Sequence, residues 1–134
     1  MPRDTPYAGV ASIFRSSLEA GRPPAVFEDG RQIRDFVHVS DVARANLLAL
    51  AAPPGRAGIY NVASGRPRPL IDMARLLSDA AGPDAPDPEI TGDYRLGDVR
   101  HVFADAGKAR EQLGFEAAVG LEAGMREFAT ADLR

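Results

Sequence analysis

The clearest pattern along the chain is the recurrence of apolar residues every three or four positions, which predicts amphipathic helices. One helix is expected to open at Thr5-Pro6, a hydroxyl N-cap followed by proline, and to stop before Gly21. Three more are expected near residues 70–81, 106–113 and 121–129. Their apolar positions, in chain order, are Tyr7, Val10, Ala11, Phe14 and Leu18; Leu70, Met73, Ala74 and Leu77; Ala106, Ala109 and Leu113; Leu121, Met125, Phe128 and Ala129.

A fifth predicted helix, over residues 42–52, is apolar on almost every side. Only Arg44 and Asn46 interrupt its hydrophobic surface. Ser40 or Asp41 is expected to cap its first turn. A helix that is hydrophobic all round is typical of a buried position.

Short β-branched and aromatic runs predict strands at residues 25–27, 33–39, 58–62 and 89–91. These strands are too few to build a complete doubly wound sheet. We therefore expect a helix-rich α/β fold and a single domain over residues 1–134. Residues 82–100 are the least regular stretch, because Pro83, Pro86 and Pro88 disfavour long elements, and a functional loop is expected there.

Composition excludes several classes of function. The 134 residues include 16 Lys and Arg against 19 Asp and Glu, a net charge of −3, which argues against a general nucleic-acid binder. There is no cysteine, so disulfides, thiolate zinc sites and cysteine nucleophiles are excluded. No apolar run approaches a membrane span, and the sequence opens without a signal-peptide pattern, which favours a cytoplasmic protein. Two histidines without a carboxylate cluster make a metal site unexpected.

The first candidate for chemistry is the stretch 30–43. Arg34 alternates with Phe36, so one strand face could present a guanidinium beside an aromatic ring, an arrangement that suits a phosphate next to a base or sugar. The simpler interpretation is a surface pair of Arg34 with Asp35 and a helix cap at Asp41, because exposed ion pairs are common and weak.

The second candidate is the stretch 94–101. Arg95 could reach a phosphate while Asp98 accepts a hydrogen bond from a ribose hydroxyl, and the simpler interpretation is a solvated charged loop. His38 lies in an apolar stretch, where a structural histidine is the more ordinary role. The sequence contains no Gly-x-Gly-x-x-Gly, no P-loop and no Gly-x-Ser-x-Gly elbow, so it supplies no dinucleotide loop.

Four segments, taken in order, resemble one family. They are RDFVHVSDVA at 34–43, IYNVASG at 59–65, RLGDVR at 95–100, and the stretch from Phe103-Ala104-Asp105 to Leu113-Gly114-Phe115. They resemble the C-terminal part of the extended short-chain dehydrogenases, the NAD-dependent nucleotide-sugar epimerases and dehydratases. The family's glycine fingerprint and Tyr-x-x-x-Lys pair are not in this sequence, since the residues four after Tyr7, Tyr60 and Tyr94 are Ala11, Ser64 and Asp98.

The resemblance implies a substrate-binding role, with a nucleoside-diphosphate sugar as the partner. Arg34 and Arg95 would bind the diphosphate, Asp98 a ribose hydroxyl, and Phe27 would line the base, with Arg100 as an extra phosphate or sugar contact. The resemblance implies no catalytic residue here and no cofactor bound by this chain alone, with NAD expected for the complete enzyme.

Three hypotheses stay open. The leading one is the nucleotide-sugar-binding part of an NAD-dependent epimerase/dehydratase, inactive without a Rossmann half that a separate chain could supply. The others are a standalone nucleotide-sugar-binding module and a truncated, non-functional remnant. A phosphate- or nucleic-acid-binding module of unrelated fold is the distant alternative, and the net charge of −3 counts against it.

Overall fold

A computed structural model describes residues 9–132 and contains five helices and five two-residue strands in that range. The helices are α1 (Val10–Glu19), α2 (Val39–Leu50), α3 (Leu70–Ala81), α4 (Gly107–Leu113) and α5 (Leu121–Thr130). The strands are β1 (Ala25–Val26), β2 (Ile33–Arg34), β3 (Arg68–Pro69), β4 (Glu89–Ile90) and β5 (His101–Val102). The expected helix-rich α/β class is confirmed for this range, and its sheets are small.

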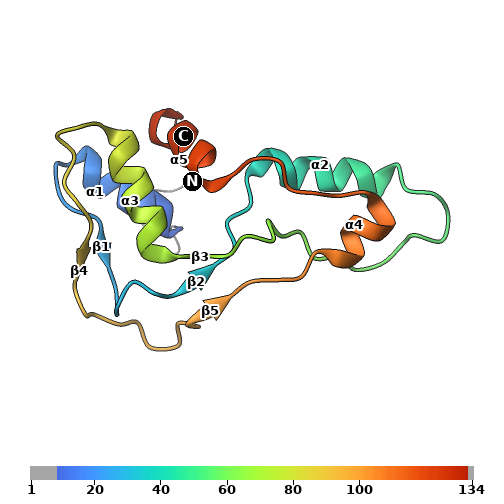
Figure 1. Ribbon diagram of the computed structural model, residues 1–134, viewed down its shortest axis with the longest axis horizontal. Coiled ribbons are helices and arrows are strands. Elements are labelled where there is room, and N and C mark those ends of the chain that lie inside the picture. The colour runs from blue at the N-terminus through green and yellow to red at the C-terminus, as the bar shows by residue number, and fades with distance from the viewer. Residues whose placement is uncertain (1–8, 133–134) are drawn as a thin grey trace.

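The strands form two separate sheets. β1 pairs in parallel with β4, while β2 lies between antiparallel β3 and parallel β5. The ribbon is elongated, with α1, α3, β1 and β4 toward one end and α2 and α4 toward the other (Figure 1). The β2 sheet lies between these two ends, so β2 and β5 carry the chain from one end toward the other.

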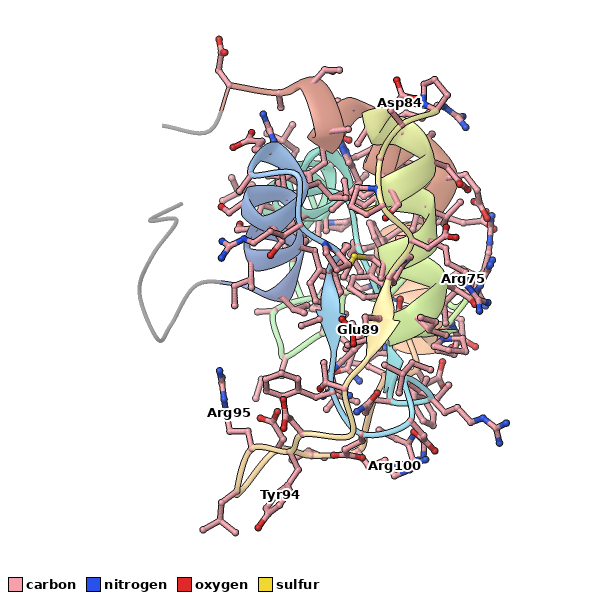
Figure 2. All side chains as sticks on the ribbon, turned by 90° about the vertical axis from the view of Figure 1, so that its left-hand side faces the viewer. Arg75, Asp84, Glu89, Tyr94, Arg95 and Arg100 are labelled. Carbon is pink, nitrogen blue, oxygen red and sulfur yellow. The ribbon has the colours of Figure 1, made fainter. Side chains whose placement is uncertain are left out.

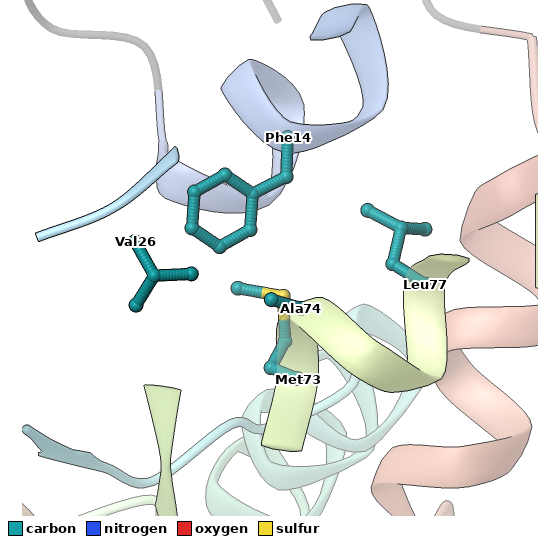
Figure 3. Packing of buried hydrophobic residues seen from close by; sticks show 5 residues of the cluster. All are labelled: Phe14, Val26, Met73, Ala74 and Leu77. Carbon is teal, nitrogen blue, oxygen red and sulfur yellow. The ribbon is translucent and has the colours of Figure 1, made fainter. Parts of the chain in front are cut away.

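The larger hydrophobic core packs α1 and α3 against β1. Its buried members are Phe14, Val26, Met73, Ala74 and Leu77 (Figure 3). Residues of α5 cover the cluster from the side of α3. The helical spacing that predicted α1, α3 and α5 therefore also identified the faces of these helices that pack together. Thr5, Pro6 and Tyr7 of the expected first helix lie outside the described residues.

The smaller core lies at the α2 end. Ala45 of α2 packs with Ala109 of α4, Phe115 and Ala117, and Leu48 and Tyr60 border them. Gly114 ends α4 in the left-handed region, with φ 68°, a conformation that glycine adopts without steric cost. Asp105 stabilises the start of α4, because its carboxylate accepts a hydrogen bond at 2.7 Å from the N–H of Gly107, the first residue of the helix.

The prediction that the 42–52 helix is buried is wrong. Only Asp41 and Ala45 are buried in α2, and Leu50 is 84% exposed. The cap assignment is wrong as well, because the helix begins at Val39 and His38 is its N-cap, accepting a hydrogen bond from the Ser40 N–H through Nδ1 at 3.3 Å. The sequence pattern predicted an apolar helix correctly. Burial also requires a packing partner, and in residues 9–132 only one side of α2 packs against other elements.

The predicted strands are also shorter than expected. The expected strand at 33–39 is paired only at β2, and residues 58–62 pair with no other strand in the described part of the chain. The irregular stretch at 82–100 is confirmed, with β4 as its one paired element. Within residues 9–132, no helix is long and apolar enough to cross a membrane.

Candidate functional site

Four of the five residues expected to bind substrate line a single pocket of about 380 Å³. Ligand pockets in proteins are commonly of this size. The pocket brings together residues from four stretches of the sequence: 10–14, 25–34, position 70 and 95–98. Its lining consists of Phe27, Arg34, Arg95 and Asp98 with Val10, Ile13, Phe14, Ala25 and Leu70.

Phe27 reaches the pocket because a tight turn follows β1. Glu28 has φ 52° and Gly30 has φ 73°, and the Gly30 N–H donates to the Phe27 carbonyl at 3.2 Å. The buried Gln32 side chain also donates to that carbonyl, from Nε2 at 2.9 Å. The turn reverses the chain into β2, and β2 places Arg34 at the same pocket as Phe27.

Arg34 is half-buried, and its guanidinium holds the neighbouring loop through backbone oxygens. Nη1 donates to the carbonyls of Ile33 and Arg100, both at 2.9 Å, and Nη2 donates to that of Val99 at 2.8 Å. A guanidinium carries five N–H donors, so Nε and one hydrogen of Nη2 remain for a ligand. Because no carboxylate pairs with Arg34 in residues 9–132, its full positive charge is available to an anion in the pocket.

Arg95 and Asp98 lie on the exposed loop between β4 and β5. The Asp98 N–H donates to the Arg95 carbonyl at 3.1 Å, which closes a turn and directs both residues to the pocket. Figure 2 shows Arg95 on the α1 side of this loop. Neither side chain has a hydrogen-bond or ion-pair partner within the described range, so both can bind a ligand without breaking a protein contact.

Arg100 lies on the same loop but does not line the pocket. Its guanidinium bridges two carboxylates of the β1–β2 turn, Glu28 at 2.8 Å and Asp29 at 2.7 Å. The hydrogen bond from Arg100 holds the pKa of Asp29 below its ordinary value, and the same bond raises the pKa of Arg100. As placed, Arg100 fastens the loop that carries Arg95 and Asp98 to the turn that carries Phe27.

Phe36 is not the aromatic neighbour of Arg34. It packs against the α1–α3 core and lines other hollows, because the chain leaves the extended ladder after Arg34. The aromatic rings in the Arg34 pocket are those of Phe14 and Phe27. Phe14 was expected only as a core residue, and nothing in its helical spacing distinguishes a core position from a pocket wall.

The simpler interpretation of the first motif is also wrong in both parts. Asp35 does not pair with Arg34, and its Oδ1 accepts a hydrogen bond from the Ser64 N–H at 2.9 Å. Asp41 is not the N-cap; its Oδ1 and Oδ2 accept the N–H groups of Ala118 at 3.0 Å and Val119 at 2.9 Å. These two carboxylates therefore fix distant backbone segments to the motif.

Asp41 is kept ionised although it is buried. Burial acts to raise its pKa, but the hydrogen bonds from Ala118, Val119 and Arg44 outweigh burial, and the pKa lies below its ordinary value. The Arg44 Nη2 atom is 3.1 Å from Oδ1 of Asp41. The charged carboxylate thus joins the start of α2 to the segment that leads into α5.

The pocket has two kinds of wall. Aromatic and aliphatic side chains form one, and two guanidinium groups with one carboxylate form the other. Guanidinium groups match phosphate oxygens in geometry and charge, while a carboxylate accepts hydrogen bonds from hydroxyl groups. The arrangement suits a ligand with an aromatic part, hydroxyls and a phosphate group.

Comparison with known proteins identifies the relatives of this chain. A sequence model of the NAD dependent epimerase/dehydratase family matches residues 2–63. The dTDP-L-rhamnose 4-epimerase of Burkholderia thailandensis is 35% identical over 92% of this chain, and the UDP-glucose 4-epimerase of Mycolicibacterium smegmatis is 37% identical over 92%. This chain is homologous to part of the NAD-dependent nucleotide-sugar epimerases. It spans 34% and 39% of the length of those two relatives.

Solved structures of epimerases agree with the fold. The UDP-glucose 4-epimerase of Thermotoga maritima, solved with UDP-glucose, matches with a TM-score of 0.80 and 38% identity, over 96% of this chain and 41% of its own. The UDP-N-acetylglucosamine 4-epimerase of Methanobrevibacter ruminantium, in complex with UDP-N-acetylmuramic acid, gives a TM-score of 0.83 at 30% identity, over 96% of this chain and 40% of its own. The epimerase-like part described here therefore adopts the arrangement that it has within those longer chains.

One solved structure similar to this chain, MoeE5 in complex with UDP-glucuronic acid and NAD, is 29% identical with a TM-score of 0.73, whereas residues 9–132 contain no glycine-rich turn between a strand and a helix. A dinucleotide pyrophosphate needs a glycine-rich turn between a strand and a helix. In this range the closely spaced Gly55 and Gly58 follow α2 and precede a segment that is neither helix nor strand, so no helix begins directly after them.

Proposed function

We propose that this chain is the nucleotide-sugar-binding, C-terminal part of an NAD-dependent epimerase/dehydratase, and that it binds a nucleoside-diphosphate sugar in the Arg34 pocket. The observation that carries the proposal is the convergence of Phe27, Arg34, Arg95 and Asp98 on one pocket from separate stretches of the sequence. The similar enzymes act on dTDP- and UDP-linked sugars by name, so UDP and dTDP are the first candidates for the nucleotide.

Within the pocket each residue has a distinct role. Arg95 and the free N–H groups of Arg34 bind the diphosphate, whose negative charge the two guanidinium groups neutralise. Asp98 accepts a hydrogen bond from a ribose hydroxyl, and Phe27 packs against the base. Arg100 contributes by holding the loop rather than by touching the ligand. Hydride transfer and proton transfer are assigned to the Rossmann half with NAD, because this sequence has no Tyr-x-x-x-Lys pair.

The test is a thermal melt and a calorimetric titration of the purified chain with UDP, dTDP, GDP and NAD. We expect one nucleoside diphosphate to bind and to raise the melting temperature, and NAD to have no effect. A ligand present at 100 times its Kd adds about 2.7 kcal/mol of apparent stability. Arg95→Ala should raise the Kd of that nucleoside diphosphate about 10- to 100-fold, because a charge-assisted hydrogen bond contributes about 1.5–3 kcal/mol.

Arg75→Ala is the matched control. Arg75 is exposed on α3, away from the pocket lining, and has no ion-pair partner within the described range (Figure 2). The Arg75→Ala substitution changes the net charge of the chain by the same amount as Arg95→Ala. Equal weakening by the two variants, or no binding of any nucleoside diphosphate at millimolar concentration, would refute the proposal.

A further inference from the structure

A second hollow, of about 140 Å³, lies between α4 and the segment that leads into β3. Its lining shares no residue with the Arg34 pocket. Three buried alanines and the buried ring of Phe115 make its inner wall apolar. The polar side chains of the lining are Ser64, Arg66, Arg110 and Glu116. The hollow exceeds several-fold what one water needs, so it has room for a tetrahedral oxyanion.

Arg66 and Arg110 bring two guanidinium groups to this hollow from different parts of the fold. Arg66 precedes β3, and Arg110 belongs to α4. Both side chains are exposed, and within residues 9–132 neither has a hydrogen-bond acceptor or an acidic partner. Two guanidinium groups without a counter-charge attract an anion, and the planar fork of each matches the oxygens of a phosphate group.

The other two polar side chains determine which anion suits the hollow best. The Glu116 carboxylate forms no ion pair with either arginine in the described part of the chain, so its oxygens can accept a hydrogen bond from a hydroxyl group. Its charge repels an anion that offers no such hydroxyl. The Ser64 Oγ atom accepts the Arg66 N–H at 3.0 Å, which leaves the hydroxyl hydrogen of Ser64 for a ligand oxygen.

The walls of the hollow are held in place by bonds within the protein. The Ser64 N–H donates to Oδ1 of Asp35 at 2.9 Å, which fixes one wall. On the other wall, the Arg44 guanidinium donates to the Glu116 carbonyl and lies 5.5 Å from the centre of the Phe115 ring. A site that is already formed loses little conformational entropy when a ligand binds.

We propose that this hollow is a second anion site, and that it binds a small phosphate monoester that carries a hydroxyl group. Arg66 and Arg110 bind the phosphate oxygens, and the Ser64 hydroxyl donates to one of them. Glu116 accepts the hydrogen bond of the ligand hydroxyl. The site is separate from the Arg34 pocket and does not depend on the proposed function.

Titrations followed by the NMR shifts of backbone amides test the site. The probes are methyl phosphate and glycerol 3-phosphate, two monoesters that differ in their hydroxyl groups. Near pH 8 both are dianions, because their second pKa is about 6. At constant ionic strength we expect saturable shifts at residues 63–66 and 115–117 in the millimolar range, with the lower Kd for glycerol 3-phosphate. Any binding in the Arg34 pocket is read separately, from the amides of Phe27 and Asp98.

Two outcomes of these titrations would overturn the proposal. Residues 63–66 and 115–117 that show no saturable shift at about 50 mM probe would exclude the site. An equal Kd for the two probes would exclude the hydroxyl-bearing ligand class.

Three variants test the roles of the side chains. Arg66→Ala and Arg110→Ala should each raise the Kd of glycerol 3-phosphate about 10-fold, as expected for the loss of one charge-assisted hydrogen bond. Glu116→Ala should lower the Kd of methyl phosphate and remove the preference for glycerol 3-phosphate. All three side chains are exposed, so the melting temperature should not change.

Arg75→Ala is again the matched control, because Arg75 is exposed on α3 and lines neither this hollow nor the Arg34 pocket (Figure 2). It removes one positive charge, as Arg110→Ala does, and it should leave both Kd values unchanged. Weakening by Arg75→Ala as large as that by Arg110→Ala would show a diffuse response to net charge and would overturn the site. Shifts at 63–66 and 115–117 that persist unchanged when both Arg66 and Arg110 are alanine would overturn it as well.

Discussion

The Asp41 carboxylate offers the sharpest test of how the two ends of the molecule are joined. Replacing it with alanine removes three hydrogen bonds, two from the backbone N–H groups of Ala118 and Val119 and one from Arg44. A hydrogen bond to a charged group contributes about 1.5–3 kcal/mol, and bonds that act as one unit are not additive. We expect Asp41→Ala to lower the free energy of unfolding by about 3–4 kcal/mol. For a chain of this size that loss corresponds to a melting temperature lower by about 11–14 °C.

The effect has a defined pH dependence. The folded chain holds the pKa of Asp41 below its ordinary value of 3.8, so the unfolded chain binds more protons between the two values. Stability therefore rises with pH across that window. The contribution of Asp41 is complete above about pH 5 and is lost as the pH falls below about 4 and through the folded pKa.

Urea unfolding followed by circular dichroism measures both effects. The difference between wild type and Asp41→Ala should be constant from pH 5 to pH 8 and should shrink at pH 3. Asp84→Ala is the control, because Asp84 is exposed and its carboxylate has no partner within the described residues (Figure 2). A loss no larger than the ±0.5 kcal/mol or so of a surface substitution, or an equal loss at pH 3 and pH 7, would refute the reasoning.

Three further predictions concern the pocket and its supports. Phe14→Ala should lower the free energy of unfolding by about 3–5 kcal/mol in urea titrations, because a fully buried ring is removed from the α1–α3 core. Gly30→Ala should cost about 1–3 kcal/mol in the same titrations, since φ is 73° and the new Cβ would lie 3.1 Å from Cβ of Ile71. Arg100→Glu should speed amide exchange over residues 91–100, and adding Asp29→Arg should restore the wild-type rate by re-forming the ion pair with reversed charges. A double variant that exchanges as fast as Arg100→Glu would contradict the role of Arg100 in holding the loop.

Local periodicity predicted helices well but could not predict what covers them. The spacing of Met73, Ala74 and Leu77 identified α3 and the face that it buries, because the packing partners of α3 lie within the same chain. The same reasoning failed for α2, whose apolar surface is exposed on one side. An apolar side chain favours burial, but whether it is buried depends on packing partners from other parts of the fold, which a local sequence pattern does not contain. The unpaired segment at 58–62 failed as a predicted strand for the same reason.

The candidate site was predicted by motif and not by spacing. Arg34, Arg95 and Asp98 were selected through a family resemblance, and they line one pocket with Phe27. Spacing alone favoured a surface ion pair with a helix cap for the first motif and a solvated charged loop for the second. Asp41 illustrates what neither approach supplied, since its bonds to residues 118 and 119 join positions far apart in the sequence. Such contacts are set by tertiary packing and leave no local signal.

The three carbonyl bonds of Arg34 have a consequence for how this position can vary among homologous proteins. A planar guanidinium can reach the carbonyls of Ile33, Val99 and Arg100 and still keep two N–H groups free, whereas an ammonium group has three donors in all. A lysine at position 34 could donate either to the three backbone carbonyls or to a ligand, but not to both, because its ammonium group has only three N–H donors. Arg95 makes no such bonds, so a lysine there would still supply a positive charge to the pocket. Among natural sequences that keep this loop, we therefore expect position 34 to be arginine almost without exception and position 95 to accept lysine.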